Sequence, residues 1–446
     1  MNKKFYLFAA AAAVLSLTAC SSDDDAVQTN GAQTAAVNQA VSFDTYVPNA
    51  TRAYTAGVMT TELLGEPGFG VFAYHNLGTN AADGSYDNSV GPNFMYDQAV
   101  TYGTSWTYTP LKYWPNETTK DMLAVSGSAY SGTVATPTKN DVLSFFAYAP
   151  YVVSSTSTTA GTASGINDVM DNDVVDADPW IQYTVSTVPS QCVDLVWGVA
   201  PAGGLSYTAV NNNNISVGQG LPLKNLVKPS KDQKIKFLFQ HALARIGMTV
   251  VAAVDQIAPG GNLDSNTKIY VNSVTIADAG TTIPSYGKLN LNNTNAGIAL
   301  WTDVNTATKY SATIDGSNLN SDLKSGGNGV TTTEKTVIAQ VSSKNQYLML
   351  IPTPGTAGVF NVTIDYDVVT TDAALVGETS TVNNVITKQI TLNTPSTFSP
   401  GVAGFVNNKA YNLKLILGMT SVKLDAEVAD WEVDGSTDVN LPRNNE

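Results

Sequence analysis

The sequence contains very little histidine, cysteine and arginine. Its 446 residues include two histidines (His75 and His241), two cysteines (Cys20 and Cys192) and three arginines. These numbers are too small for a zinc ribbon, a three-histidine metal centre or a disulfide scaffold. The net charge of -14 also disfavours nucleic-acid binding, which requires a basic footprint. We therefore expect no metal, no cofactor and no nucleic-acid partner.

The motifs of the common enzyme classes are missing as well. The sequence has no GxSxG, HExxH, P-loop or glycine-rich dinucleotide fingerprint. An acidic run at 170–178 offers oxygen ligands for calcium, but it lacks the glycine and the final glutamate of an EF-hand loop, so a solvated loop is favoured. Cys192 has no histidine near it in the sequence, which is typical of a buried structural thiol. We predict no catalytic residue, and His241 is expected to have a structural role.

The N-terminal segment has the features of an export signal. Two lysines precede an apolar run at 5–17, which is 13 residues long and too short to span a bilayer comfortably. The sequence Leu-Thr-Ala-Cys that ends at Cys20 resembles a bacterial lipobox. That resemblance implies removal of residues 1–19 and a lipid on Cys20. The aspartates at 23–25 resemble the surface-export signals of Bacteroidetes lipoproteins. An ordinary signal peptide with an incidental cysteine is the alternative.

The rest of the chain has the pattern of β-strands. β-Branched residues dominate, turn residues separate the apolar runs, and helical periodicity is nearly absent, so we predict an all-β protein built from sandwiches. The clearest predicted strands cover residues 70–74, 143–148, 194–199, 234–239, 245–254, 269–276, 347–351, 360–369, 386–392 and 410–417. A charged, proline-containing break near residue 232 predicts an N-terminal domain at 53–232 and a C-terminal domain at 233–446. Polar segments at 153–178 and 201–220 are expected to be long exposed loops.

Several aromatic motifs occur in an order that resembles one protein family. They are GVFAY at 70–74, YWP at 113–115, LSFFAYAP at 143–150, FQHALAR at 239–245 and the C-terminal block at 411–431. Core packing of aromatic residues explains each motif alone. Their order, together with the lipobox, is similar to that of fimbrillins, the type V pilus subunits of Bacteroidetes. The resemblance implies two transthyretin-like β-sandwich domains in tandem and assembly into a surface filament that supports adhesion.

A strand pattern at 41–47 lies shortly before one of the three arginines. Its alternate positions form one face of a half-buried strand: Val41, Phe43, Thr45 and Val47. In fimbrillins a secreted Arg-specific protease cuts after an arginine in such a place. The resemblance therefore places a cut between Arg52 and Ala53, which would remove the lipidated propeptide 20–52 and its strand. An unprocessed loop arginine is the alternative.

The C-terminal tail, about 432–446, has a similar alternating face. Its members are Val433, Thr437, Val439 and Leu441. A sandwich that loses a strand exposes an apolar groove and unpaired backbone groups, which are a template for a strand from another chain. We predict that the tail fills the groove of the next subunit, a contact that does not close and therefore builds a filament. A polar tail with a few incidental valines would show the same pattern.

The sequence favours a stalk or tip subunit of a cell-surface fimbrium. The implied partners are copies of the chain or other fimbrillins, the Arg-specific protease and, before the cut, outer-membrane lipid. A tip position would add ligands on host or bacterial surfaces. Two alternatives stay open: a monomeric glycan-binding surface lipoprotein, and an anchor subunit that keeps its lipid. Both would retain an acylated Cys20, so the chain ends distinguish them from the filament subunit.

Overall fold

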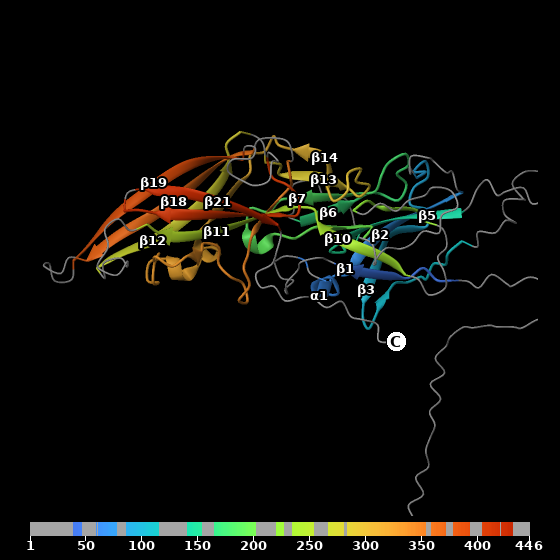
Figure 1. Ribbon diagram of the computed structural model, residues 1–446, viewed down its shortest axis with the longest axis horizontal. Coiled ribbons are helices and arrows are strands. Elements are labelled where there is room, and N and C mark those ends of the chain that lie inside the picture. Colours follow the sequence, from blue (N-terminus) through green and yellow to red (C-terminus); the bar gives the residue numbers. More distant parts are fainter. Residues whose placement is uncertain are drawn as a thin grey trace, which may run out of the picture. The chain divides into compact units, whose positions relative to one another are not determined.

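The computed structural model describes most of the chain between residues 39 and 430. The described residues are 39–46, 59, 61–77, 86–115, 141–153, 165–201, 220–226, 234–253, 266–280, 283–353, 358–371, 378–392, 404–419 and 421–430. This part is nearly all β, which confirms the predicted fold class (Figure 1). Its helical elements are α1 (Thr61–Leu64) and the 3-10 turns η1 (Pro189–Gln191), η2 (Gly316–Asn318) and η3 (Ser321–Leu323). None of the described helices has the length and apolar character needed to cross a membrane.

The first sheet has eight strands in the order β1-β10-β8-β5-β2-β3-β4, with β9 paired to β5. They are β1 (Phe43–Tyr46), β2 (Phe69–Leu77), β3 (Met95–Tyr102), β4 (Trp106–Thr107), β5 (Asp141–Ala149), β8 (Val196–Val199), β9 (Leu223–Leu226) and β10 (Ile235–His241). β1 pairs in parallel with β10, whereas the other pairings of this sheet are antiparallel. β1 is thus an edge strand, and Figure 1 shows it against β10.

Three further sheets complete the described structure. One runs β14-β13-β7-β6, with β6 (Gly165–Val169), β7 (Trp180–Thr184), β13 (Tyr286–Asn290) and β14 (Leu300–Asn305). The next has β11 (Ala244–Ala252) between β16 (Lys335–Thr336) and β17 (Leu348–Leu350) on one side and β20 (Lys409–Leu417) on the other, followed by β21 (Val422–Asp430). The last runs β15-β12-β18-β19, with β12 (Thr267–Asp278), β15 (Ser311–Ile314), β18 (Gly358–Thr371) and β19 (Thr379–Leu392).

The first sheet separates two hydrophobic clusters. Along β5, Phe145 and Ala147 belong to the smaller cluster, while Phe146 and Tyr148 belong to a larger one that continues into the other three sheets. We call the smaller cluster the groove cluster; it also contains Phe43. Because both faces of β5 are covered, its sequence is apolar at nearly every position instead of alternating.

All ten predicted strands are present; their ends differ by at most a few residues, except that β19 begins at Thr379, well before the predicted start at residue 386. The expectation of a continuous loop at 153–178 is wrong, because β6 (Gly165–Val169) lies within it and pairs with β7. The polar composition of β6 and a register shift in the pairing hide this strand from a pattern search. The predicted division near residue 232 lies outside the described residues and stays a prediction. β10 pairs with β1 and β8, and β11 pairs with later strands.

Candidate strand-exchange groove

The segment 39–46 is held by two separate parts of the chain. Two backbone hydrogen bonds of 2.9 Å join residues 39–41 to residues 112–114 in an antiparallel bridge. The segment then passes to β10, where the Ile235 N–H donates to the Ser42 carbonyl at 2.8 Å. From there β1 runs in register with the first residues of β10, from Phe43 opposite Ile235 onward. This segment therefore lies in a groove formed by other elements of the chain, and we call the part of the groove that holds β1 its seat.

Phe43 is the central side chain of that seat. It is 2% exposed, and its ring centroid lies 5.5–6.1 Å from the rings of Phe69, Tyr108, Phe145 and Phe237. Val41 is buried beside it, and its carbonyl accepts a hydrogen bond of 2.8 Å from the Tyr108 hydroxyl. Burial raises the pKa of Tyr108 from 10.0 to about 12, so the hydroxyl keeps the proton that it donates even well above neutral pH. Aromatic rings thus line the seat around one phenylalanine.

A glycine shapes the far wall of the groove. A Cβ atom at Gly198 of β8 would lie 2.7 Å from the ring of Phe237, which is closer than carbon atoms can approach. Phe237 in turn stacks on Phe43, with ring centroids 5.9 Å apart and an interplanar angle of 19°. A glycine inside a strand often marks such a close approach. Gly198 therefore allows the ring of Phe237 to lie where Phe43 needs it.

The chain is fixed again at Met59, beyond the predicted cut. Met59 is buried in the groove cluster, and its N–H donates to Asp194 Oδ2 at 2.7 Å. His241 Nδ1 lies 2.8 Å from the same oxygen, and both side chains are 1% exposed. His241 therefore makes a buried hydrogen bond, as expected for a structural residue. The sequence predicts no role for Asp194, although it begins the conspicuous Asp-Leu-Val-Trp run that leads into β8. The predicted cut would thus lie between two anchored points.

The structure places only part of the predicted site. Val41 and Phe43 are buried together and Thr45 is half-buried. Cys20, Val47 and the Arg52–Ala53 bond lie outside the described residues, as do the candidate donor residues Val433, Thr437, Val439 and Leu441. β21 ends at Asp430, shortly before the predicted donor tail. The displacement of the first strand stays a prediction.

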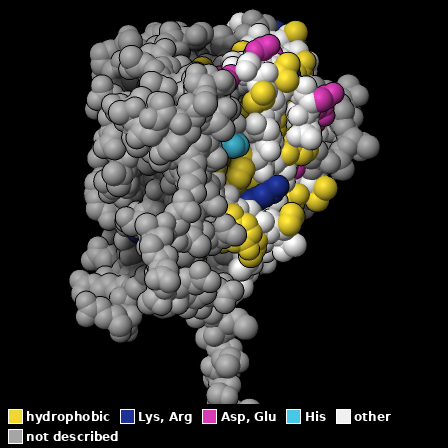
Figure 2. Space-filling view, turned by 90° about the vertical axis from the view of Figure 1, so that its right-hand side faces the viewer, with side chains coloured by type: hydrophobic (Ala, Val, Ile, Leu, Met, Phe, Trp, Pro, Cys, Tyr) yellow, Lys and Arg dark blue, Asp and Glu magenta, His cyan; other side chains and the backbone are white. Residues whose placement is uncertain are grey.

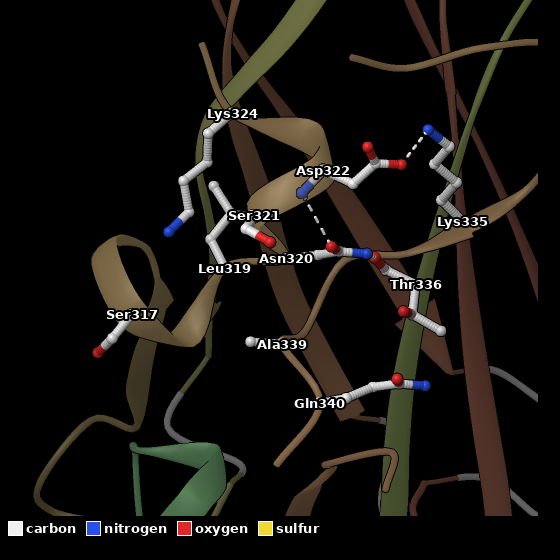
Figure 3. Close-up of a pocket in the computed structure, with 10 residues that line it drawn as sticks. All are labelled: Ser317, Leu319, Asn320, Ser321, Asp322, Lys324, Lys335, Thr336, Ala339 and Gln340. Atoms are coloured by element: carbon white, nitrogen blue, oxygen red, sulfur yellow. Dashed lines mark hydrogen bonds and ion pairs between the residues drawn. The ribbon is translucent and has the colours of Figure 1, made fainter. Parts of the chain in front are cut away.

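A second recess, of about 560 Å³, lies beside η2 and η3 (Figure 3). Its lining consists of Ser317, Leu319, Asn320, Ser321, Asp322, Lys324, Lys335, Thr336, Ala339 and Gln340. Asp322 and Lys335 point toward each other and form an ion pair, while Lys324 donates to the Gly316 carbonyl. None of the ten lining residues is aromatic, whereas small-molecule sites are mostly lined by apolar and aromatic groups. The groove around β1 is the stronger candidate site.

Asp178 of the acidic run is hydrogen-bonded within the protein, and the Cys192 thiol is buried. Asp178 accepts hydrogen bonds from the Tyr86 hydroxyl (2.9 Å) and from the side chains of Asn290 and Asn292. Across the described ranges, no three histidine, cysteine or acidic side chains gather as a metal site would require. Cys192 is buried, and burial raises the pKa of its thiol to about 12. On the face in Figure 2, the described hydrophobic, acidic and basic side chains are interspersed.

Comparison with known proteins gives one curated relative and related solved structures. The fimbrium subunit Fim1C of Phocaeicola vulgatus is 23% identical over 420 residues, which cover 91% of this chain and 92% of that protein. A crystal structure of a fimbrial protein from Bacteroides vulgatus has a TM-score of 0.53 and 19% identity, and the match covers 88% of this chain and all of the other. No family model matches the chain. The predicted resemblance to Bacteroidetes fimbrial subunits is confirmed.

Proposed function

We propose that the chain is a structural subunit of a cell-surface fimbrium, assembled when β1 is exchanged for a strand of another copy. In this proposal the precursor is exported as a lipoprotein through Cys20 and cut after Arg52. The subunit then takes a stalk or tip position in a filament that supports adhesion. The similarity to a fimbrium subunit supports the filament role. The observation that carries the exchange is the seat of Phe43 among four aromatic rings.

The position of β1 makes it a separable strand. It has four residues, lies at the edge of its sheet and pairs with β10 alone among the strands of that sheet. Its pairing is parallel, which is slightly less stable per residue than antiparallel pairing. Loss of β1 would therefore leave every other strand pairing of the sheet in place.

Once β1 has left, the groove would strongly favour binding of a replacement strand. Full burial of a phenylalanine or valine side chain contributes about 1.5–3 kcal/mol each, and removal of Phe43 and Val41 forfeits both. The rings that now surround Phe43 would face water. The outer edge of β10 would also lose backbone partners at Ile235 and the residues after it. A strand with apolar residues at alternate positions restores both kinds of contact.

The contacts on either side of the predicted cut favour release of β1 while the chain after the cut stays bound. β1 ends at Tyr46, before the predicted cut, and Met59 lies after it. Met59 stays bound through Asp194, and α1 begins two residues later with Leu63 and Leu64 buried in the groove cluster. Cleavage between these anchors would free the strand on one side and leave the other side in place.

The donor in this proposal is the tail at 432–446, which follows β21. Its alternating face of Val433, Thr437, Val439 and Leu441 is similar to that of the departing strand. A tail of one copy in the groove of the next is a head-to-tail contact. Such contacts repeat without closing, so a filament results.

The test compares filament formation on cells that express the native chain, a chain that stops after Trp431, or the R52A variant. The native chain should form high-mass polymer. The tail-deleted chain should be cut at Arg52 and remain monomeric, and R52A should remain uncut and monomeric. R443A is the matched control for processing alone, because it removes an arginine outside the predicted cut and should still be cut after Arg52; it does not test assembly, since Arg443 lies in the donor tail.

Two outcomes would contradict the proposal. Normal filaments from the tail-deleted chain would exclude 432–446 as the donor. A native chain that stays monomeric and retains acylated Cys20 would instead favour the glycan-binding lipoprotein or the anchor subunit.

A further inference from the structure

Two aromatic side chains beside the groove are partly exposed to solvent. Tyr102, at the end of β3, is 52% exposed, and its ring centroid lies 5.1 Å from that of Trp106 in β4. Trp106 also contacts the buried ring of Phe69, with centroids 4.9 Å apart, and Phe69 contacts Phe43. Aromatic contacts thus continue from the seat to the surface of the molecule. We call Tyr102 and Trp106 the aromatic pair.

The aromatic pair lies toward the end of the groove where β1 stops. β4 is close to β1, although the two strands are not paired. The paired register ends at Tyr46, and Phe239, which follows the last paired residue of β10, contacts Phe69 with ring centroids 5.4 Å apart. The opposite end of the groove lies at residues 112–114, which bind residues 39–41. A strand that continues past the position of Tyr46 therefore reaches the aromatic pair.

The sequence around the aromatic pair fits a cation. The stretch 98–115, which contains both rings, has no aspartate or glutamate, although the whole chain has 37 acidic residues. Its one charged residue is Lys112, whose backbone binds Val41 at the other end of the groove. A guanidinium group over a tryptophan or tyrosine ring is attracted by the negative face of that ring. An arginine at these rings would meet no competing carboxylate from this stretch.

The candidate donor tail contains one arginine, Arg443, and the strand alternation specifies its position. The predicted inward positions of the first strand are 41, 43, 45 and 47. A tail that runs in the direction of β1 offers the same spacing at Thr437, Val439, Leu441 and Arg443. In this register Val439 takes the place of Phe43, and Arg443 follows the end of β1.

The two neighbouring registers fit the groove less well. In one of them Thr437, a polar side chain, would take the place of Phe43 among the aromatic rings. In the other, Pro442 would lie at position 44, inside β1. Alternate residues of a parallel strand bond to its partner, and the bond from Ile235 to the Ser42 carbonyl shows that these are the even-numbered residues of β1. Proline lacks the N–H that position 44 requires, so it fits better at position 46, where β1 ends.

We propose that Arg443 of the incoming tail binds over the aromatic pair of the next copy and fixes the register of the donor strand. The inference rests on the proposed strand exchange and adds the residue that aligns the donor in the groove. The occupant is the C-terminal tail of another copy, because the tail at 432–446 is longer than the segment 39–46 that it replaces. Its last residues must therefore lie beyond the seat, where the aromatic pair is exposed.

The test is thiol cross-linking in filaments from cells that produce the full chain. The variant T104C/N444C places one thiol in the turn between β3 and β4, where Thr104 is exposed, and the other beside Arg443. A short bis-maleimide joins these thiols where they lie close together. V304C/N444C is the matched control, because Val304 is a 45% exposed residue of β14, which belongs to another sheet. The native chain gives the background, since Cys192 is buried.

We expect at least tenfold more cross-linked oligomer from T104C/N444C than from the control, at equal amounts of polymer. Filaments of R443Q should dissociate about two- to fivefold faster in hot detergent than native filaments, whereas R443K filaments should match native ones because the cation is retained. Y102S should have the same effect as R443Q. The double variant R443Q/Y102S should dissociate no faster than either single variant, because the two changes remove one contact.

The outcomes separate this inference from the proposed function. Polymer without excess cross-linking from T104C/N444C would overturn the contact of Arg443 and leave strand exchange standing. A cross-link confined to single chains would also overturn it, because the tail would then bind its own copy. A native chain that forms no polymer would overturn strand exchange and this contact together.

Discussion

Replacement of Phe43 by alanine should destabilise the uncut chain and leave the assembled filament unaffected. Phe43 is 2% exposed and contacts four aromatic rings, so the uncut chain should lose about 3–5 kcal/mol of its free energy of unfolding. Urea denaturation of F43A/R52A against R52A measures this loss, because R52A keeps both chains uncut. After cleavage Phe43 is gone, so F43A filaments should resist heat and detergent as well as native filaments do.

Phe237→Ala is the matched control for this prediction. Phe237 stacks on Phe43 from β10, and it remains in the groove after the cut. F237A should therefore weaken both the uncut chain and the filament. The reasoning would be refuted if F43A weakened the filament as much as the uncut chain, because β1 would then still be in its seat. An F43A/R52A chain as stable as R52A would show that the ring is not buried in the groove.

The remaining predictions concern the surroundings of the groove. Asp194→Ala removes the shared hydrogen-bond partner of the buried His241 ring and the Met59 N–H, and it should lower the free energy of unfolding by about 1–3 kcal/mol for each lost hydrogen bond in a urea titration; a total loss below about 1 kcal/mol would contradict the contact. Tyr108→Phe removes the hydrogen bond to the Val41 carbonyl, which only the uncut chain contains, and should therefore cost the uncut chain about 0.5–1.5 kcal/mol more than the filament, in which the lost contacts are those of the hydroxyl with Lys112. Cys192 should remain unlabelled by iodoacetamide at pH 8 in the folded chain and react fully in urea, as measured by intact mass, because burial raises the pKa of its thiol to about 12; rapid labelling of the folded chain would contradict this.

The alternation of residues at 41–47 predicts which side chains of the first strand face inward. Val41 and Phe43 follow the period of two, and the structure buries both. The same rule finds ten further strands, since their apolar residues are either alternate or continuous. Among the strands that it misses are β6 and β13, whose short sequences GINDV and YGKLN mix small and polar residues. In such strands the cross-strand partners, and not the local pattern, determine the structure.

The contacts that define the groove join residues far apart in the sequence. The Met59 N–H and Asp194 are separated by 135 positions, and β1, the first strand of the first sheet in sequence, pairs with β10, the last one. No local pattern specifies either pairing, because both depend on which strands the fold brings together. Gly198 did leave a signal, since a glycine within an apolar strand indicates a close approach. The identity of the approaching ring, Phe237, required the structure.

The N-terminus of the protein in the high-mass fraction of the cell surface tests the central claim most directly. Edman sequencing or intact-mass analysis of that fraction, after the filaments are dissociated, reads it without any variant. Exchange of β1 predicts a chain that begins at Ala53 and has lost residues 39–46. A polymer whose subunits begin at acylated Cys20 would contradict the account, because Phe43 would still occupy the groove.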